Sequence, residues 1–140
     1  MGRFIGLKNQ NALIPFFKHY KVALVGAGPT RNKISKQAHP YKDNVYMPKQ
    51  LFGKELVDVI SKSSVMVHPS LSEGIPRVFI EAMSCGVPVI ALSRTIKGIV
   101  ENGENGYLVD EKDLISDWNA TSRPPADVDA HPVEALGCST

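Results

Sequence analysis

The 140-residue chain has little of what marks a secreted, membrane-spanning or metal-binding protein. Its two cysteines, Cys85 and Cys138, form neither a disulfide framework nor a metal spacing. His19, His39 and His131 have no metal-ligand spacing among them. No window approaches the roughly 18 uninterrupted apolar residues of a membrane span, and the first residues lack the apolar region of a secretory signal. We therefore expect a cytoplasmic protein in a reducing setting, without a membrane span.

Runs of like charge are also missing, yet the two signs are divided unevenly along the chain. No run of five like charges occurs and no aromatic residues interleave with the basic ones, so the sequence gives little support to nucleic-acid binding. Residues 1–62 carry eleven Lys and Arg against three Asp and Glu, whereas residues 63–140 carry five against eleven. This asymmetry fits an anion-binding first half, or simply two solvated surfaces of different sign.

Short apolar runs alternate with amphipathic stretches along most of the chain. This pattern predicts strands at 3–6, 21–25, 44–47, 64–68, 87–92 and 107–109, and helices at 11–20, 31–38, 54–61, 75–84 and 96–101. Such alternation is typical of βαβ units, and continuous apolar strands are typical of burial on both faces. We predict an α/β fold with a parallel sheet and helices on both faces. The domain spans residues 1–113, and the proline-rich remainder, 114–140, is expected to be an irregular, disordered tail.

Ligands of parallel α/β sheets bind outside the carboxyl ends of the strands, which selects the loops at 6–10, 26–30, 47–50 and 69–77. The loop from Pro69 to Arg77 enters a predicted helix, whose unpaired N–H groups and dipole suit a diphosphate or a carboxylate. Gly74 allows a ligand to approach the main chain closely. Ser70 and Ser72 do not form the G-x-S-x-G nucleophile elbow, so a serine hydrolase is not indicated.

Two carboxylates bracket this helix start. Eight residues separate Glu73 from Glu81, on the order of 12 Å of helical rise, which exceeds the roughly 5–9.5 Å between the carboxyls of a glycosidase pair. The spacing suits an extended, hydroxyl-bearing ligand held at both ends. The alternative is that Glu73 caps the helix and that Glu81 is a solvated charge.

Four further features each have two interpretations. Arg3, at the first strand, and Lys8, in the loop after it, are either anion ligands or ordinary surface charge. The segment Gly26-Ala-Gly-Pro-Thr-Arg31 is either the opening of a dinucleotide fingerprint, with Arg31 in place of its third glycine, or a tight turn. His68 ends a predicted strand as a satisfied buried histidine or as a group lining the site.

Taken together, these segments resemble the C-terminal donor-binding half of family 4 glycosyltransferases, which have the two-domain GT-B architecture. The segment from His68 to Ala91 (HPSLSEGIPRVFIEAMSCGVPVIA) resembles the E-x7-E signature of that family and its following strand entry. Residues 2–9 resemble its G-R-x4-K phosphate segment, 24–29 its second strand and turn, and 98–109 its last loop and strand. The resemblance covers about residues 1–113 and implies a Rossmann-like sheet.

The resemblance implies a role for each matching residue. Arg3, Lys8 and Glu73 would be the catalytic residues, the two cations on the donor diphosphate and Glu73 on the hydroxyls of the transferred sugar. Main-chain groups of the helix entrance would approach the sugar and the phosphates, and Glu81 would bind the ribose. The remaining donor-binding positions are Gly26, Tyr46 and Met47, the last two beside the base, and, at the helix entrance, Gly74, Ile75, Pro76 and Arg77.

The resemblance also implies a reaction, namely transfer of a hexose from a UDP or GDP sugar with retention, as in polysaccharide biosynthesis. No metal or other cofactor is expected, because cations and a helix start stabilise the leaving diphosphate. The acceptor-binding domain of the family would precede this segment, so we expect this chain alone to bind donor and to catalyse little. The alternative is a stand-alone, non-catalytic module that binds a nucleotide or a sugar phosphate.

Overall fold

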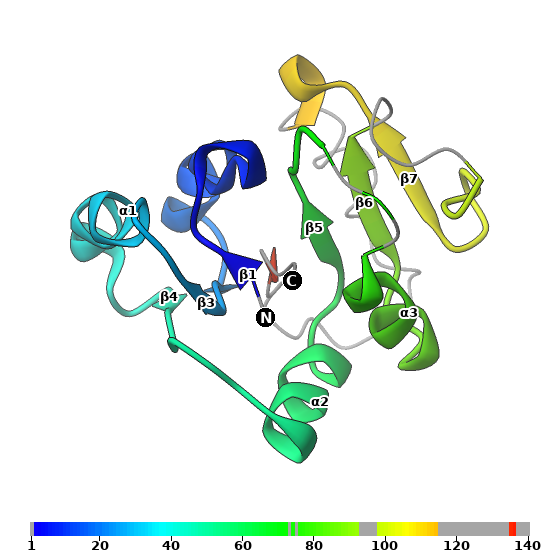
Figure 1. Ribbon diagram of the computed structural model, residues 1–140, viewed down its shortest axis with the longest axis horizontal. Helices are drawn as coiled ribbons and strands as arrows, with labels where there is room; N and C mark the ends of the chain where they lie inside the picture. Colours follow the sequence, from blue (N-terminus) through cyan, green and yellow to red (C-terminus); the bar gives the residue numbers. More distant parts are fainter. Residues whose placement is uncertain (1, 73, 75, 93–97, 115–134, 137–140) are drawn as a thin grey trace.

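The computed structural model describes residues 2–72, 74, 76–92, 98–114 and 135–136 (Figure 1). Its strands are β1 (Gly2–Arg3), β2 (Val22–Ala23), β3 (Gly26–Ala27), β4 (Val45–Tyr46), β5 (Met66–His68), β6 (Val89–Leu92), β7 (Gly106–Val109) and β8 (Ala135–Leu136). Its α-helices are α1 (Arg31–Ala38), α2 (Gly53–Ser61) and α3 (Arg77–Ser84). Its 3-10 helices are η1 (Gly6–Lys8), η2 (Gln10–Lys18), η3 (His39–Tyr41) and η4 (Glu111–Asp113).

Every strand pairing in the described chain is parallel. The pairing orders are β4-β2-β8, β1-β3 and β5-β6-β7. Strands β2 and β3 belong to one extended segment, because the hydrogen bonds with the β4 segment continue through both of them. The N–H groups of Leu24 and Gly26 donate to the carbonyl oxygens of Tyr46 and Pro48. Strands β1 and β8 therefore lie end to end along the other edge of that segment, and β8 also contacts β5 (Figure 1).

The two faces of the sheet are buried against different helices. On one face, Val22, Leu24, Val67 and Ile90 pack with residues of η2 and α1. On the other face, their sequence neighbours Ala23, Val25, Met66 and Val89 pack with residues of α2 and α3. Successive strand residues point to opposite faces, so this alternation confirms the predicted α/β sheet with helices on both sides. Among the described residues, no helix combines the length and the apolar character needed to cross a membrane.

Local chemistry explains where the elements differ from the predicted ones. Helix α1 has the predicted bounds. The helix expected at 11–20 is instead the 3-10 helix η2, with Pro15 inside it, where proline removes a main-chain donor. Helix α3 begins at Arg77 rather than at 75, because Pro76 is extended (ψ 119°) and forms the N-cap. The helix expected at 96–101 is wrong for its described part, residues 98–101, where Gly98 has a φ of +90°.

The segment 114–140, expected to be irregular, contains the strand β8. Its two residues pair in parallel with β2, Ala135 opposite Val22 and Leu136 opposite Ala23. Both β2 residues are buried, and buried main-chain groups require hydrogen-bond partners. Strand β8 supplies a neighbour on the side of β2 that faces away from β4. Residues 115–134 and 137–140 lie outside the described chain.

Candidate functional site

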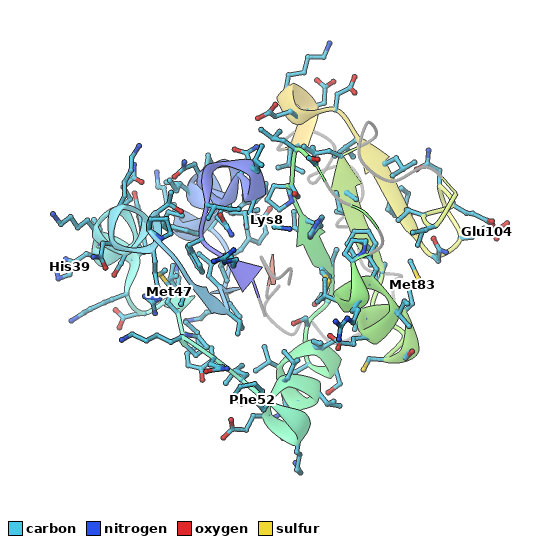
Figure 2. All side chains as sticks on the ribbon, in the orientation of Figure 1. Lys8, His39, Met47, Phe52, Met83 and Glu104 are labelled. Carbon is cyan, nitrogen blue, oxygen red and sulfur yellow. The ribbon has the colours of Figure 1, made fainter. Side chains whose placement is uncertain are left out.

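Two of the selected loops are joined by hydrogen bonds. The N–H of Leu71, in the loop after β5, donates to the carbonyl oxygen of Leu7 in η1 at 2.8 Å. The hydroxyl oxygen of Ser70, which is 1% exposed, lies 3.2 Å from the same oxygen and 3.1 Å from the carbonyl oxygen of Ser72. The segment carrying Lys8 is thereby fixed beside the loop that leads into α3, and Figure 2 shows Lys8 on the side of η1 that faces β5.

The two predicted diphosphate ligands lie at the end of β1. Arg3 is exposed, and its main-chain carbonyl accepts a 3.0 Å hydrogen bond from Nε2 of Gln10, a side chain that is 3% exposed. Lys8 is half-buried and ends η1. Asn9 follows it in the left-handed conformation (φ 51°), which turns the chain into η2. The structure thus places both cations on the short stretch 3–8, Arg3 as the last residue of β1 and Lys8 at the end of η1.

The start of α3 is open in the described part of the loop. No side chain of a described residue caps the helix at Pro76, so the first N–H groups have no partner inside the helix. Gly74 is exposed, and a Cβ built on it would have nothing within 4 Å. The predicted sugar ligand Glu73 and the neighbouring Ile75 lie outside the described residues. The main chain around Gly74 can therefore be approached by a ligand.

Arg77 and Glu81 lie one turn apart on α3, and both are exposed. Neither side chain forms a hydrogen bond or an ion pair with a described residue. Glu81 is therefore an uncommitted carboxylate. This is compatible with both interpretations of the residue, as the group that binds the ribose and as a solvated charge. Its binding role remains a prediction. Among the described residues, no three His, Cys, Asp or Glu side chains are grouped as a metal site.

The ends of β3 and β4 meet at a side chain that sequence reasoning did not assign to the site. Arg31, the first residue of α1, donates from Nε to the carbonyl oxygen of Gly26 at 3.1 Å and from Nη2 to the carbonyl oxygen of Met47. Gly26 is buried, and its N–H donates to the carbonyl oxygen of Pro48 at 3.1 Å. Tyr46 is 54% exposed. In the sequence, the one indication of this contact is that Arg31 stands where the dinucleotide fingerprint has its third glycine.

The turn between β3 and α1 is shaped by a close approach of two main chains. Gly28 has a φ of +152°, and a Cβ on it would lie 2.5 Å from the carbonyl oxygen of Phe4. The N–H of Thr30 also donates to that oxygen, at 3.0 Å. Gly28 is thus required by the packing of the turn against β1, which supports the tight-turn interpretation of this segment.

Three buried polar side chains adjoin these strand ends. His68 is 2% exposed, and its ring meets that of Phe79 edge-on, with 4.9 Å between the ring centres, so the structure places it in the core. The Oε1 atom of Gln10 and the Oγ1 atom of Thr30 are buried without a hydrogen-bond partner among the described residues. Gln10 and Thr30 both stand next to polar residues in the sequence, so no pattern marked their side chains as partly or fully buried.

Two solved structures share this fold. The pneumococcal O-GlcNAc transferase GtfA, solved in complex with UDP and GlcNAc, superposes with a TM-score of 0.68 at 22% identity over 84% of this chain and 26% of that chain. The catalytic domain of the cholesterol-α-glucosyltransferase from Helicobacter pylori superposes with a TM-score of 0.61 at 22% identity over 86% of this chain and 83% of that chain. The fold is that of a GT-B-type glycosyltransferase domain.

The sequence comparison identifies the family. The family model described as glycosyl transferases group 1 matches residues 7–121, and the chain belongs to that family. An uncharacterized glycosyltransferase of Haemophilus influenzae is 29% identical over 77% of this chain and 31% of its own length. A UDP-Gal:α-D-GlcNAc-diphosphoundecaprenol α-1,3-galactosyltransferase of Escherichia coli is 31% identical over 81% of this chain and 29% of its own length. The chain thus spans less than a third of the length of these two relatives.

Proposed function

We propose that the chain is the C-terminal, donor-binding half of a retaining family 4 glycosyltransferase, which moves a hexose from a nucleotide-diphosphate sugar to an acceptor hydroxyl. The observation that carries the proposal is the junction of Leu7 with Ser70 and Leu71. It fixes the segment with two cations beside the loop that enters a helix capped by no described side chain, at the edge of the sheet where ligands of such folds bind.

The diphosphate would lie between these two segments. Arg3 at the end of β1 and Lys8 in η1 supply positive charge, and the first N–H groups of α3 supply donors from the other segment. Both act on the negative charge that grows on the leaving nucleotide, so they stabilise the transition state without a bound metal. The open space at Gly74 leaves room for the phosphates or the sugar against the main chain.

The rest of the donor would extend along the same edge. Glu81, exposed and uncommitted on α3, accepts hydrogen bonds from the ribose hydroxyls. Glu73, Ile75 and the main-chain groups of the helix entrance hold the sugar. The base lies beside Tyr46 and Met47, near the buried turn at Gly26. A UDP donor has support from the Escherichia coli relative, whose name specifies UDP-Gal.

In the proposed reaction the bond between the anomeric carbon and the donor phosphate oxygen breaks. A bond between that carbon and the acceptor oxygen forms on the same face, which retains the configuration. The acceptor proton passes to the departing phosphate oxygen. Arg3, Lys8 and the start of α3 hold that phosphate, and no residue of the chain becomes covalently attached to the sugar.

The acceptor would be held by a second domain, as in two-domain GT-B enzymes, and this chain alone would bind donor without efficient turnover. The proposal places the reaction in the cytoplasm, in polysaccharide biosynthesis. The free, half-buried thiol of Cys85 is compatible with a reducing setting.

Calorimetric titration of the 140-residue chain with UDP and with GDP tests the proposal. We expect one of them to bind, and Lys8→Ala and Glu81→Gln each to raise its Kd by about tenfold, the effect of losing one charged hydrogen bond. Lys33→Ala and Glu104→Gln remove exposed charges of the same types elsewhere and serve as matched controls. Absence of binding by the folded chain, or equal losses in the controls, would contradict the proposal.

A further inference from the structure

One cation at the strand ends has no role in the proposed function. Arg31 is half-buried at the first position of α1 and contacts the ends of three strands. Its guanidinium meets the carbonyl oxygens of Gly26, in β3, and Met47, which follows β4. Its Cζ atom lies 5.9 Å from the centre of the ring of Phe4, which follows β1. A single side chain thus links the three strand ends on this side of the site.

The geometry requires an arginine rather than any cation. The planar guanidinium directs several N–H groups along fixed lines, so that Nε and Nη2 can serve two carbonyls at once. A cation over an aromatic face adds a further attraction. Arg31 forms no ion pair with a described residue. Its N–H groups donate to main-chain carbonyls, and its positive charge is not neutralised by a described carboxylate.

The hydrogen-bonding directions of Met47 follow from the strand pairing. The carbonyl oxygen of Tyr46 points toward β2, because it accepts the N–H of Leu24 at 2.8 Å. The N–H of Met47, on the opposite side of the same planar peptide, points away from β2. It has no hydrogen-bond partner among the described residues, and the next residue, Pro48, has no N–H. The contact from Arg31 fixes Met47 so that this one N–H is presented in a constant direction.

We infer that Arg31 is a positioning residue for base recognition: by holding Met47 and Gly26 it orients the main-chain groups that select the base of the bound nucleotide. This inference rests on the proposed donor site. Its consequence is specific: loss of the contacts from Arg31 to Gly26 and Met47 reduces the discrimination between bases more than it reduces the affinity that comes from the diphosphate.

The test compares UDP, GDP and ADP binding by the 140-residue chain, in the wild type and in Arg31→Lys. Lysine keeps the charge and loses the two-pronged contact. Lys33→Gln, an exposed position on the same helix, is the matched control. We expect the ratio of Kd values between the second-best and the best nucleotide to fall about fivefold to tenfold in Arg31→Lys, the worth of one hydrogen bond. We also expect the amide resonance of Met47 to shift in that variant and not in the control.

Other outcomes overturn the inference in distinguishable ways. A wild type that binds none of the three nucleotides contradicts the proposed function and this inference with it. A wild type that binds nucleotide, with the same ratio of Kd values in Arg31→Lys, contradicts the inference alone. Equal weakening for all three nucleotides, together with a lower Tm, would assign Arg31 a purely structural role.

Discussion

The main-chain N–H of Leu71 donates a 2.8 Å hydrogen bond to the carbonyl oxygen of Leu7, which joins the loop after β5 to the segment after β1. Neither residue is a candidate ligand, and Leu7 is 58% exposed. Their bond matters because it fixes the spacing between Lys8 on one side and the entrance of α3 on the other. The candidate site is therefore built by main-chain contacts between loops, and the charged side chains are placed on that frame.

The hydroxyl of Ser70 reinforces this junction. Replacing Ser70 with alanine removes a buried group that lies between the carbonyl oxygens of Leu7 and Ser72. We expect a loss of about 1 kcal/mol in the free energy of unfolding and a severalfold weaker nucleotide affinity, measured by denaturation and calorimetry. Ser72→Ala, which alters an exposed hydroxyl, should leave both unchanged. Equal behaviour of the two variants would show that the Ser70 hydroxyl does not support the junction.

Two glycines of the loops should respond oppositely to alanine. At Gly74 a Cβ meets open space, so Gly74→Ala should keep the stability and weaken nucleotide binding by occupying the approach to the main chain. At Gly28 a Cβ would lie 2.5 Å from the carbonyl oxygen of Phe4, at a φ of +152°. We expect Gly28→Ala to cost about 2 kcal/mol or more from strain and overlap. Thermal unfolding and titration of both variants check this contrast, and a destabilised Gly74→Ala would refute the ligand interpretation of that glycine.

Gln10 should influence the site through Arg3. Its Nε2 holds the carbonyl oxygen of Arg3, while its Oε1 is buried without a partner among the described residues. Gln10→Leu removes one of the two donors to that carbonyl, which still accepts the N–H of Ile5 at 3.1 Å. The lost hydrogen bond costs about 1 kcal/mol. It also removes the orphaned Oε1, which opposes the loss. We expect a small net change in stability but weaker nucleotide binding, and unchanged binding would show that the Gln10 contact does not position Arg3.

Strand β8 should contribute to the stability of the sheet. It lies between β2 and β5, and proline is tolerated in sheets mainly on edge strands and at bulges. The N–H groups of Val22 and Leu24 donate toward β4, so the residue of β8 whose N–H faces β2 is Ala135. We expect Ala135→Pro to lower the free energy of unfolding by about 1 kcal/mol or more beyond Ala135→Gly, which keeps the N–H. Chemical denaturation of both variants measures the difference. Equal stabilities of the two Ala135 variants would mean that the N–H of Ala135 contributes no pairing with β2 in solution.

Periodicity and punctuation predicted most of the fold. Continuous apolar runs marked the buried strands, and α1 has the predicted bounds because no proline or glycine interrupts 31–38. The predictions departed where one residue changed the local geometry, as Pro15 did in η2 and Gly98 did after residue 97. Strand β8 was not predictable, because a short strand in a proline-rich segment is determined by unpaired groups of β2 far away in the sequence.

The candidate site was predictable as a set of loops and less so as a set of contacts. From the sequence alone, the carboxyl-end rule selects the segments that carry Lys8, Gly74 and Met47. It could not show that Arg31 bridges two of these strand ends or that Ser70 joins two of these loops. Such contacts connect residues that are distant in sequence, and a single chain carries no pattern that reports them.

The most direct test of the central claim is hydrogen exchange of the 140-residue chain with and without saturating UDP or GDP, whichever binds. The account predicts slower exchange at the amides of 6–8, 70–72 and 77–79, along the carboxyl ends of the strands, because a bound ligand stabilises the segments that it contacts. Exchange at Lys21 and 42–45, by the amino ends of β2 and β4, should not change. Protection confined to those amino ends, with none along 6–8 and 70–79, would contradict the account.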